Sequence, residues 1–284
     1  MDTTQAITHL GLCAGYCGIE LGLKRVLPAL RTVALCEIEA FACANLVAKM
    51  EEGFLDPAPI WTDLKSFPWA DFRGKVDILT GGYPCQPFSA AGNRLGKDDP
   101  RHLWPFIADG VRLLQPRICF FENVEGHISL GLREVIEELE GLGYKTTWGI
   151  FSASEVGAPH QRKRVFIMAY RNSERGQLQD WGKLAAKQMF IGNGQARGNV
   201  WPSRCGEPQL CWEPHRVLDD SKGGEPKPQM GRDADECPSW LGHAKLFLVS
   251  DNKVDELRLL GNGVCPATAE RAFRVLVKQL LSGD

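Results

Sequence analysis

The stretch ITHLGLCAGYCGIELGLKRVL, residues 7–27, decides the fold class of this chain. Its first six residues, Ile7–Leu12, form a short apolar run that predicts a strand, and residues 19–27 carry a helical pattern. The glycine-rich turn 14–18 lies between them. A strand, a tight turn and a helix in this order are typical of an α/β unit that holds a ligand at the helix N-terminus.

The alternation of strands and helices continues as far as residue 170, and one more helical pattern follows near the end of the sequence. Further strands are predicted at 33–36, 76–79, 118–121, 145–151 and 164–169, and further helices at 40–50, 103–114, 133–142 and 267–281. Strands separated by helices favour a parallel sheet that is covered on both faces. We therefore expect an α/β fold with a doubly wound, mostly parallel sheet.

The amino-acid composition of the sequence changes after Tyr170. From there to about residue 250 the chain is rich in Gly, Pro, Asn and Gln, and it holds four of the eight tryptophans. Disordered segments are poor in aromatic residues, so we expect a small loop-rich domain at 171–254. Residues 1–170 and 255–284 would form the larger domain.

Composition excludes several classes of protein. With 44% hydrophobic and 24% charged residues and a mean hydropathy of −0.20, the chain is typical of a globular protein, and charges interrupt every apolar run. The first residues carry no export signal, so we expect a cytoplasmic protein without membrane contact. The ten cysteines include no C-x-x-C pair, which argues against a metal site. A net charge of −2 excludes a globally basic nucleic-acid binder but allows a local basic face.

Cys85 is the candidate nucleophile. It lies in Pro84-Cys85-Gln86-Pro87, directly after a predicted strand, where open α/β sheets place their ligand crevice. A thiol has a pKa of about 8.5, so a nucleophilic role requires a setting that favours the thiolate. A buried structural cysteine is the alternative. The neighbouring Gln86 and Ser89, and a loop with Gly, Asn and Arg at 92–101, favour the reactive interpretation.

Charged groups follow the later strands. Glu122 ends the apolar run 118–121, where its carboxyl group could protonate or hydrogen-bond a heterocycle nitrogen; a surface acid or a helix cap is the alternative. In the extended segment 161–164, Arg162 and Arg164 would face one side and Lys163 the other. A solvated basic cluster is the alternative for these residues.

Glu37 ends the second predicted strand. An acid at this position in a doubly wound fold binds ribose hydroxyls, which with the glycine-rich turn indicates a nucleoside-containing cofactor. The turn lacks the G-x-G-x-x-G spacing, so a nicotinamide oxidoreductase is disfavoured. A turn that needs glycine for steric reasons alone is the other alternative.

Taken in order, these motifs resemble those of the cytosine-5 DNA methyltransferases of bacteria and phages. The series runs from the glycine-rich turn through Pro84-Cys85-Gln86, Glu122-Asn123-Val124, Gln161-Arg162-Lys163-Arg164 and a variable region to Gly261-Asn262-Gly263-Val264. It covers residues 7–169 and about 257–281. Each motif is short, but five in the right order are highly specific.

The resemblance implies methyl transfer from S-adenosylmethionine to carbon 5 of a cytosine flipped out of duplex DNA, on a methyltransferase fold. Cys85 would attack ring carbon 6 and Glu122 would donate to ring nitrogen 3. Arg162 and Arg164 would position the base and Glu122. The family's first motif usually has Asp, Phe and Gly where this chain has Gly11, Cys13 and Cys17.

The resemblance also implies the binding residues. Those expected around the cofactor are Cys13, Gly15, Tyr16, Gly18, Glu37, Ile38, Asp63, Leu64, Leu103, Asn262 and Gly263. Those expected on DNA are Gln86, Ser89 and Arg94, in the loop that closes over the duplex, together with the target-recognition domain 171–254.

The expected partner is double-stranded DNA, bound by a monomer that has no obligate protein partner. A cognate restriction endonuclease, if there is one, would act separately. Two alternatives stay open: a catalytically impaired DNA-binding protein, and a tRNA cytosine methyltransferase of the same architecture.

Overall fold

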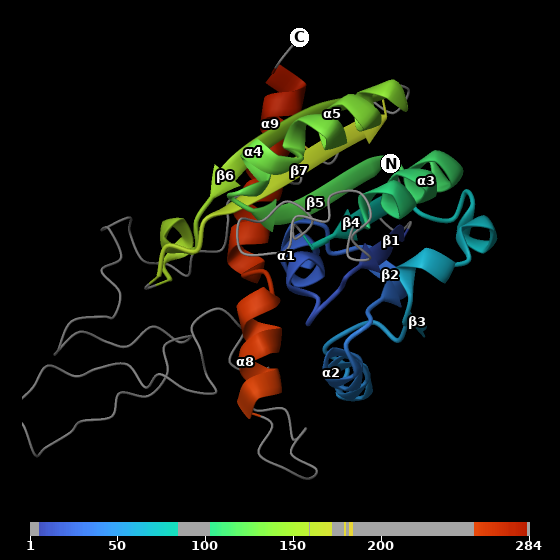
Figure 1. Ribbon diagram of the computed structural model, residues 1–284, viewed down its shortest axis with the longest axis vertical. Coiled ribbons are helices and arrows are strands. Elements are labelled where there is room, and N and C mark those ends of the chain that lie inside the picture. The colour runs from blue at the N-terminus through green and yellow to red at the C-terminus, as the bar shows by residue number, and fades with distance from the viewer. Residues whose placement is uncertain are drawn as a thin grey trace, which may run out of the picture.

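A computed structural model describes residues 6–84, 103–158, 160–171 and 253–282, together with residues 179, 182 and 183. Within them, seven strands form one sheet in the order β3-β2-β1-β4-β5-β7-β6 (Figure 1). The strands are β1 (Ile7–Leu12), β2 (Leu30–Cys36), β3 (Ile60–Trp61), β4 (Ile78–Gly81), β5 (Ile118–Val124), β6 (Tyr144–Phe151) and β7 (Arg164–Arg171).

The strand order reverses between β1 and β4. The chain moves outward from β1 through β2 to β3, then returns to place β4 on the other side of β1. These strands and β5 are parallel, whereas β7 runs antiparallel between β5 and β6. The predicted doubly wound, mostly parallel sheet is therefore confirmed. In such sheets the ligand crevice opens where the order reverses, at the carboxyl ends of β1 and β4.

Helices cover both faces of the sheet (Figure 1). On one face α1 and α9 pack against the sheet, and on the other α3 and α5 do so. The α-helices are α1 (Gly18–Val26), α2 (Ala40–Glu51), α3 (Trp104–Leu114), α4 (His127–Leu130), α5 (Leu132–Gly141), α8 (Lys253–Asn262) and α9 (Pro266–Ser282); the 3-10 helices are η1 (Leu64–Ser66), η2 (Trp69–Phe72) and η5 (Ala153–Val156). None of these described helices is long and apolar enough to cross a membrane.

The central strands are apolar on both faces because both faces are covered. In β5, Ile118 and Phe120 join the cluster under α1 and α9, while Cys119 and Phe121 join the cluster under α3 and α5. Side chains alternate along a strand, so a strand between two helix layers needs a continuous apolar run rather than an alternating one. This is why 118–121 could be recognised as a strand from sequence.

Six of the described elements were not predicted, namely β3, α4, α8 and the three 3-10 helices, and the boundary expected at 254/255 falls inside α8. β3 has only two residues, too few for a periodic signal. α8 ends with Gly261 and Asn262, both poor helix formers, and the sequence analysis placed no helix before them. Nearly all of the predicted recognition domain, 171–254, lies outside the described residues.

We predict that Phe166→Ala destabilises the fold strongly. Phe166 is fully buried, stacks on Phe120 with ring centroids 5.4 Å apart, and meets Phe151 edge-on. Its removal leaves a cavity between the sheet and α9, and we expect a loss of about 3–5 kcal/mol in urea unfolding. Ile150→Ala is the control, because Ile150 on neighbouring β6 is 41% exposed and should cost about 1 kcal/mol or less. Equal losses would contradict this account.

Candidate functional site

The glycine-rich turn at the end of β1 forms one wall of a pocket. Ala14 N donates to Cys36 O at 3.1 Å, and Cys17 N donates to Ala14 O at 2.7 Å. Gly15 has φ +53°, a conformation that costs glycine little. α1 begins directly after the turn, at Gly18, so its first N–H groups face the crevice.

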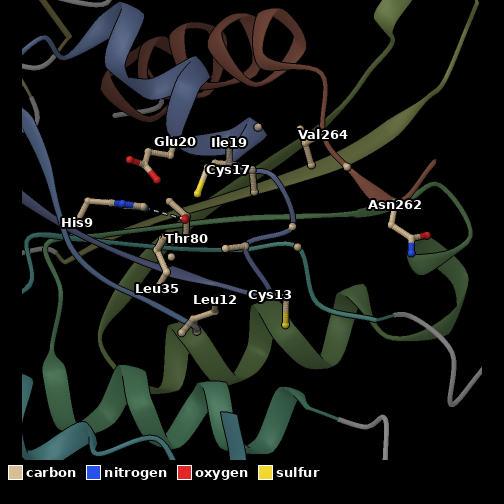
Figure 2. Close-up of a pocket in the computed structure, with 16 residues that line it drawn as sticks. His9, Leu12, Cys13, Cys17, Ile19, Glu20, Leu35, Thr80, Asn262 and Val264 are labelled. Atoms are coloured by element: carbon tan, nitrogen blue, oxygen red, sulfur yellow. Dashed lines mark hydrogen bonds between the residues drawn. The ribbon is translucent and has the colours of Figure 1, made fainter. Parts of the chain in front are cut away.

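The pocket lies between this turn, the strands β1 and β4, and the segment that follows α8 (Figure 2). Five of the residues expected around a cofactor line it: Cys13, Gly15, Gly18, Asn262 and Gly263. Its inner wall holds three polar side chains that the sequence analysis did not single out, His9, Glu20 and Thr80. All three are buried, and their only sequence signal is a polar residue inside an otherwise apolar run.

The segment 261–264 packs closely against the glycine-rich turn and is hydrogen-bonded to it. Tyr16 Oη donates to Val264 O at 2.6 Å, and a Cβ atom at Gly18 would lie 1.9 Å from the same oxygen. A Cβ atom at Gly263 would lie 1.8 Å from the ring of Tyr16. Glycine is therefore required at both positions. Tyr16 is buried and holds the segment that carries Asn262.

Glu37 lies at the end of β2 and supports the turn. Its Oε2 accepts a hydrogen bond from Gly15 N at 2.7 Å, and its Oε1 accepts one from Glu39 N at 2.9 Å. A carboxylate has about four lone-pair sites, so about two remain for a ligand. Ile38, the next residue, is 74% exposed.

The other residues expected around a cofactor lie on the α3 side of the sheet. Asp63 is exposed, and its Oδ1 accepts from Lys65 N at 3.0 Å, which caps η1. Leu64 is buried in the hydrophobic core, and Leu103 is half-buried against it.

Gly11, one of the three positions that depart from the family's first motif, is closely packed. A Cβ atom at Gly11 would lie 2.9 Å from Leu35 Cδ2 and 3.2 Å from His9 Cε1. A larger side chain there would require these neighbours to move. Nearby, burial raises the pKa of the Cys13 and Cys17 thiols above their usual range, so neither is a thiolate at neutral pH.

A second cluster of charged residues lies at the ends of β5 and β7. Arg164 Nε is 2.9 Å from Glu122 Oε1, and the Glu122 side chain is almost fully buried. Burial raises the pKa of Glu122 to about 7, although Arg164 and Arg162 both oppose the rise. A carboxyl group with this pKa can either donate or accept a proton near neutral pH.

Arg162 connects this cluster to the segment 261–264. Its Nη2 donates to Gly261 O at 2.6 Å and to Gly263 O at 2.5 Å, and its backbone has φ +35°. The alternation of side chains along an extended segment predicts that Arg162 and Arg164 face one side. In the structure the backbone of Arg162 is not extended, and both guanidinium groups lower the pKa of Glu122 against the effect of burial.

Three residues that the sequence analysis gave no role fix the backbone just before position 85. Asn123 Nδ2 donates to Tyr83 O at 3.1 Å, and the Tyr83 hydroxyl group hydrogen-bonds His127 Nε2 at 3.0 Å. Burial lowers the pKa of His127 to about 4, so the imidazole is neutral.

Cys85, Gln86, Ser89 and Arg94 lie outside the described residues. Within the described residues no group of three or more His, Cys, Asp or Glu could hold a metal ion.

Comparison with known proteins gives a family match. The model of the family described as C-5 cytosine-specific DNA methylase matches residues 7–194. The Type II methyltransferase M.NgoMIV of Neisseria gonorrhoeae is 35% identical over 173 residues, which are 58% of this chain and 52% of that protein. M.PspPI of Psychrobacter sp. is 33% identical over 60% of this chain and 41% of its own length. The chain thus spans about half the length of the curated relatives it matches.

Solved structures support the same fold. The Dnmt2 methyltransferase of S. pombe superposes over 96% of this chain and 99% of its own, with a TM-score of 0.63 and 18% sequence identity. The Entamoeba histolytica methyltransferase EhMeth superposes over 97% and 99%, with a TM-score of 0.63 and 15% identity. At these identities the similarity establishes the architecture alone.

We predict that Tyr16→Phe loosens the segment 261–264. The change leaves Val264 O without its hydrogen bond from the hydroxyl group, which should cost about 1–3 kcal/mol in unfolding free energy. Amide hydrogen exchange at Gly263, whose N–H donates to Leu259 O, should become faster.

Tyr144→Phe is the matched control. Its buried hydroxyl group donates to Pro116 O at 2.7 Å, and neither residue lines the pocket. It should cost similar stability but leave exchange at Gly263 unchanged. If both variants accelerate exchange there equally, Tyr16 has no specific hold on the segment.

We also predict that Glu122 titrates near neutral pH. Its carboxyl carbon in NMR should shift with a midpoint of about 7, and Arg164→Gln should raise that midpoint because it removes a nearby positive charge. The native pKa exceeds the ordinary value of 4.5, so the native state binds more protons than the unfolded state between these values. Stability should therefore fall as pH rises from about 4.5 to about 7, and Glu122→Gln should remove this contribution. A midpoint below 5 would contradict the prediction.

Proposed function

This chain belongs to the C-5 cytosine-specific DNA methylase family, and we propose that it methylates carbon 5 of a cytosine flipped out of a specific duplex DNA sequence. The observation that carries the proposal is the buried Glu122–Arg164 pair. Glu122 lies on β5, next to the end of β4, and Arg164 begins β7. The candidate nucleophile Cys85 follows β4 in the chain. A proton donor and a nucleophile at adjacent strand ends can act on one heterocycle.

The pocket residues fit S-adenosylmethionine as the methyl donor. The glycine-rich turn leaves open space at Gly15, where a Cβ atom would meet nothing within 4 Å. Glu37 retains about two acceptor sites for ribose hydroxyl groups, and Asn262 and Gly263 close the opposite wall. Cys13, Gly18, Ile38, Asp63, Leu64 and Leu103 complete the proposed site, and Tyr16 acts through the segment 261–264. When bound, the cofactor supplies a methyl group on a sulfonium, an electrophile for a carbon nucleophile.

The protein side chains prepare the base. The Cys85 thiolate adds to ring carbon 6, and Glu122 in its protonated form donates to ring nitrogen 3, so the ring gains electron density at carbon 5. Arg164 holds the carboxyl group of Glu122, and Arg162 orients the pair through its contacts with the segment 261–264. Once carbon 5 carries the methyl group, its proton passes to a solvent base, and the electron pair left behind forms the double bond between carbons 5 and 6 as the bond from carbon 6 to the Cys85 sulfur breaks. The thiolate is released, and ring nitrogen 3 returns its proton to Glu122.

Duplex DNA is the proposed substrate. Relatives such as M.NgoMIV are named Type II methyltransferases. We propose that Gln86, Ser89 and Arg94 contact DNA, and that 171–254 reads the sequence from the major groove. A monomer would suffice for one flipped base, and a cognate endonuclease would act separately.

We predict that the purified chain transfers radiolabelled methyl groups from S-adenosylmethionine to unmethylated genomic DNA, at cytosines of one short motif located by bisulfite sequencing. Cys85→Ser should abolish transfer and leave cofactor affinity, measured by calorimetry, within about twofold, because position 85 acts on the base.

The control variant is Cys119→Ser. Cys119 is a buried cysteine on β5 that does not line the pocket, so this variant should retain methyl transfer provided that it folds. Turnover by Cys85→Ser would exclude Cys85 as the nucleophile. Label in transfer RNA but not in DNA would establish the RNA alternative. Binding of both cofactor and DNA without transfer would establish a catalytically impaired DNA-binding protein.

A further inference from the structure

The inner wall of the pocket contains a carboxylate with an unused acceptor. Glu20, on the first turn of α1, is 2% exposed and is the one acid among the described residues that line the pocket. Its Oε1 accepts a hydrogen bond from Thr32 Oγ1 at 2.5 Å. Its Oε2 is buried and accepts no conventional hydrogen bond from the described residues. The thiol of Cys17, a weak donor, also interacts with this carboxylate.

No cation within the described residues is closely paired with Glu20. Lys24 Nζ lies 3.9 Å from Glu20 Oε1 but 2.9 Å from Asp56 Oδ2, so Asp56 is its main partner. A buried carboxylate without a close cation is costly, because burial removes the water that stabilised its charge. Glu20 therefore gains most from a ligand that brings a positive charge and hydrogen-bond donors.

The hydrogen bonds behind Glu20 have a single direction. Thr32 uses its one hydroxyl hydrogen on Glu20, so it must accept from His9 Nδ1, at 3.1 Å. His9 Nε2 is then an acceptor, and Thr80 Oγ1 donates to it at 2.8 Å. Burial lowers the pKa of His9, which agrees with a neutral ring.

These hydrogen-bond directions leave the inner wall of the pocket with hydrogen-bond acceptors facing the ligand space. With its hydrogen directed at His9, Thr80 Oγ1 keeps only lone pairs, and it lines the pocket together with Glu20. Figure 2 shows the Thr80 oxygen joined to His9, with the Glu20 carboxylate and the Cys17 thiol on the same side of the turn. Such a wall fits a group that only donates hydrogen bonds.

We propose that Glu20 is a specificity-determining residue that binds the α-ammonium group of S-adenosylmethionine, with Thr80 Oγ1 as a second acceptor. This inference rests on the proposed function. The cofactor carries two positive groups, but only the ammonium has N–H donors for Glu20 Oε2. The sulfonium has none, and its methyl group must reach the base at the crevice.

The test measures affinity by calorimetry, without DNA and without turnover, for three ligands. S-adenosylmethionine has the ammonium and the sulfonium, S-adenosylhomocysteine has the ammonium alone, and 5′-methylthioadenosine has neither. In Glu20→Gln the amide oxygen keeps the bond from Thr32, so an NH₂ group replaces the free acceptor. We expect affinity for the first two ligands to fall at least about tenfold and affinity for the third to change less than about twofold.

Glu270→Gln is the matched control. Glu270 is 5% exposed on α9, is paired with Arg25 and Arg274, and does not line the pocket. It should lower stability and leave the ratios among the three ligands unchanged.

Four outcomes would overturn the assignment. An equal loss for all three ligands in Glu20→Gln would show a structural role, unchanged affinities would show no contact, and a loss for S-adenosylmethionine alone would indicate the sulfonium. If Glu20→Gln does not fold, the test uses the wild-type chain and a fourth ligand, the analogue of S-adenosylhomocysteine that lacks only the amino group. We expect S-adenosylhomocysteine to bind at least about tenfold more tightly than this analogue. Equal affinity of the wild-type chain for S-adenosylhomocysteine and the analogue is the fourth outcome that would overturn the assignment. Failure of the wild type to bind S-adenosylmethionine would overturn the proposed function as well.

Discussion

The contact between Gly18 and Val264 is the constraint on which the rest of the site depends. The carbonyl oxygen of Val264 occupies the place where a side chain at position 18 would begin, 1.9 Å from an ideal Cβ atom. This approach brings together two distant parts of the chain, and the hydroxyl group of Tyr16, which is 248 residues before Val264, donates a hydrogen bond to the same carbonyl oxygen. The helix α9 begins two residues later, at Pro266.

The same contact joins the two halves of the site. The segment 261–264 contributes Asn262 and Gly263 to the pocket wall, while its carbonyl groups at 261 and 263 accept hydrogen bonds from Arg162. Arg162 in turn acts on Glu122. The cofactor pocket and the base-binding cluster of the proposed enzyme therefore share one short piece of backbone, so a displacement of that piece would disturb both.

Two buried carboxylates show how the fold assigns different tasks to one chemical group. Glu122 is held by Arg164 at 2.9 Å, yet burial dominates and raises its pKa to about 7, which suits a group that moves a proton. Glu20 has no guanidinium partner among the described residues and faces the pocket with an unused oxygen, which suits a group that binds a cation. The difference comes from the neighbours that each strand and helix supplies.

The sequence by itself determined the sheet and the glycine-rich turn, because these follow from local periodicity and turn chemistry; the pairing of Glu122 with its arginines was implied only by the resemblance of the motifs. It could not separate Tyr16 from its pocket-lining neighbours, and it gave no role to His9, Glu20 or Thr80. Those assignments depend on Val264, Thr32 and the surrounding strands, which are distant in sequence and adjacent only after folding. Burial and hydrogen-bond direction are properties of the tertiary structure, so only the folded chain decides which polar residues serve the ligand and which serve the fold.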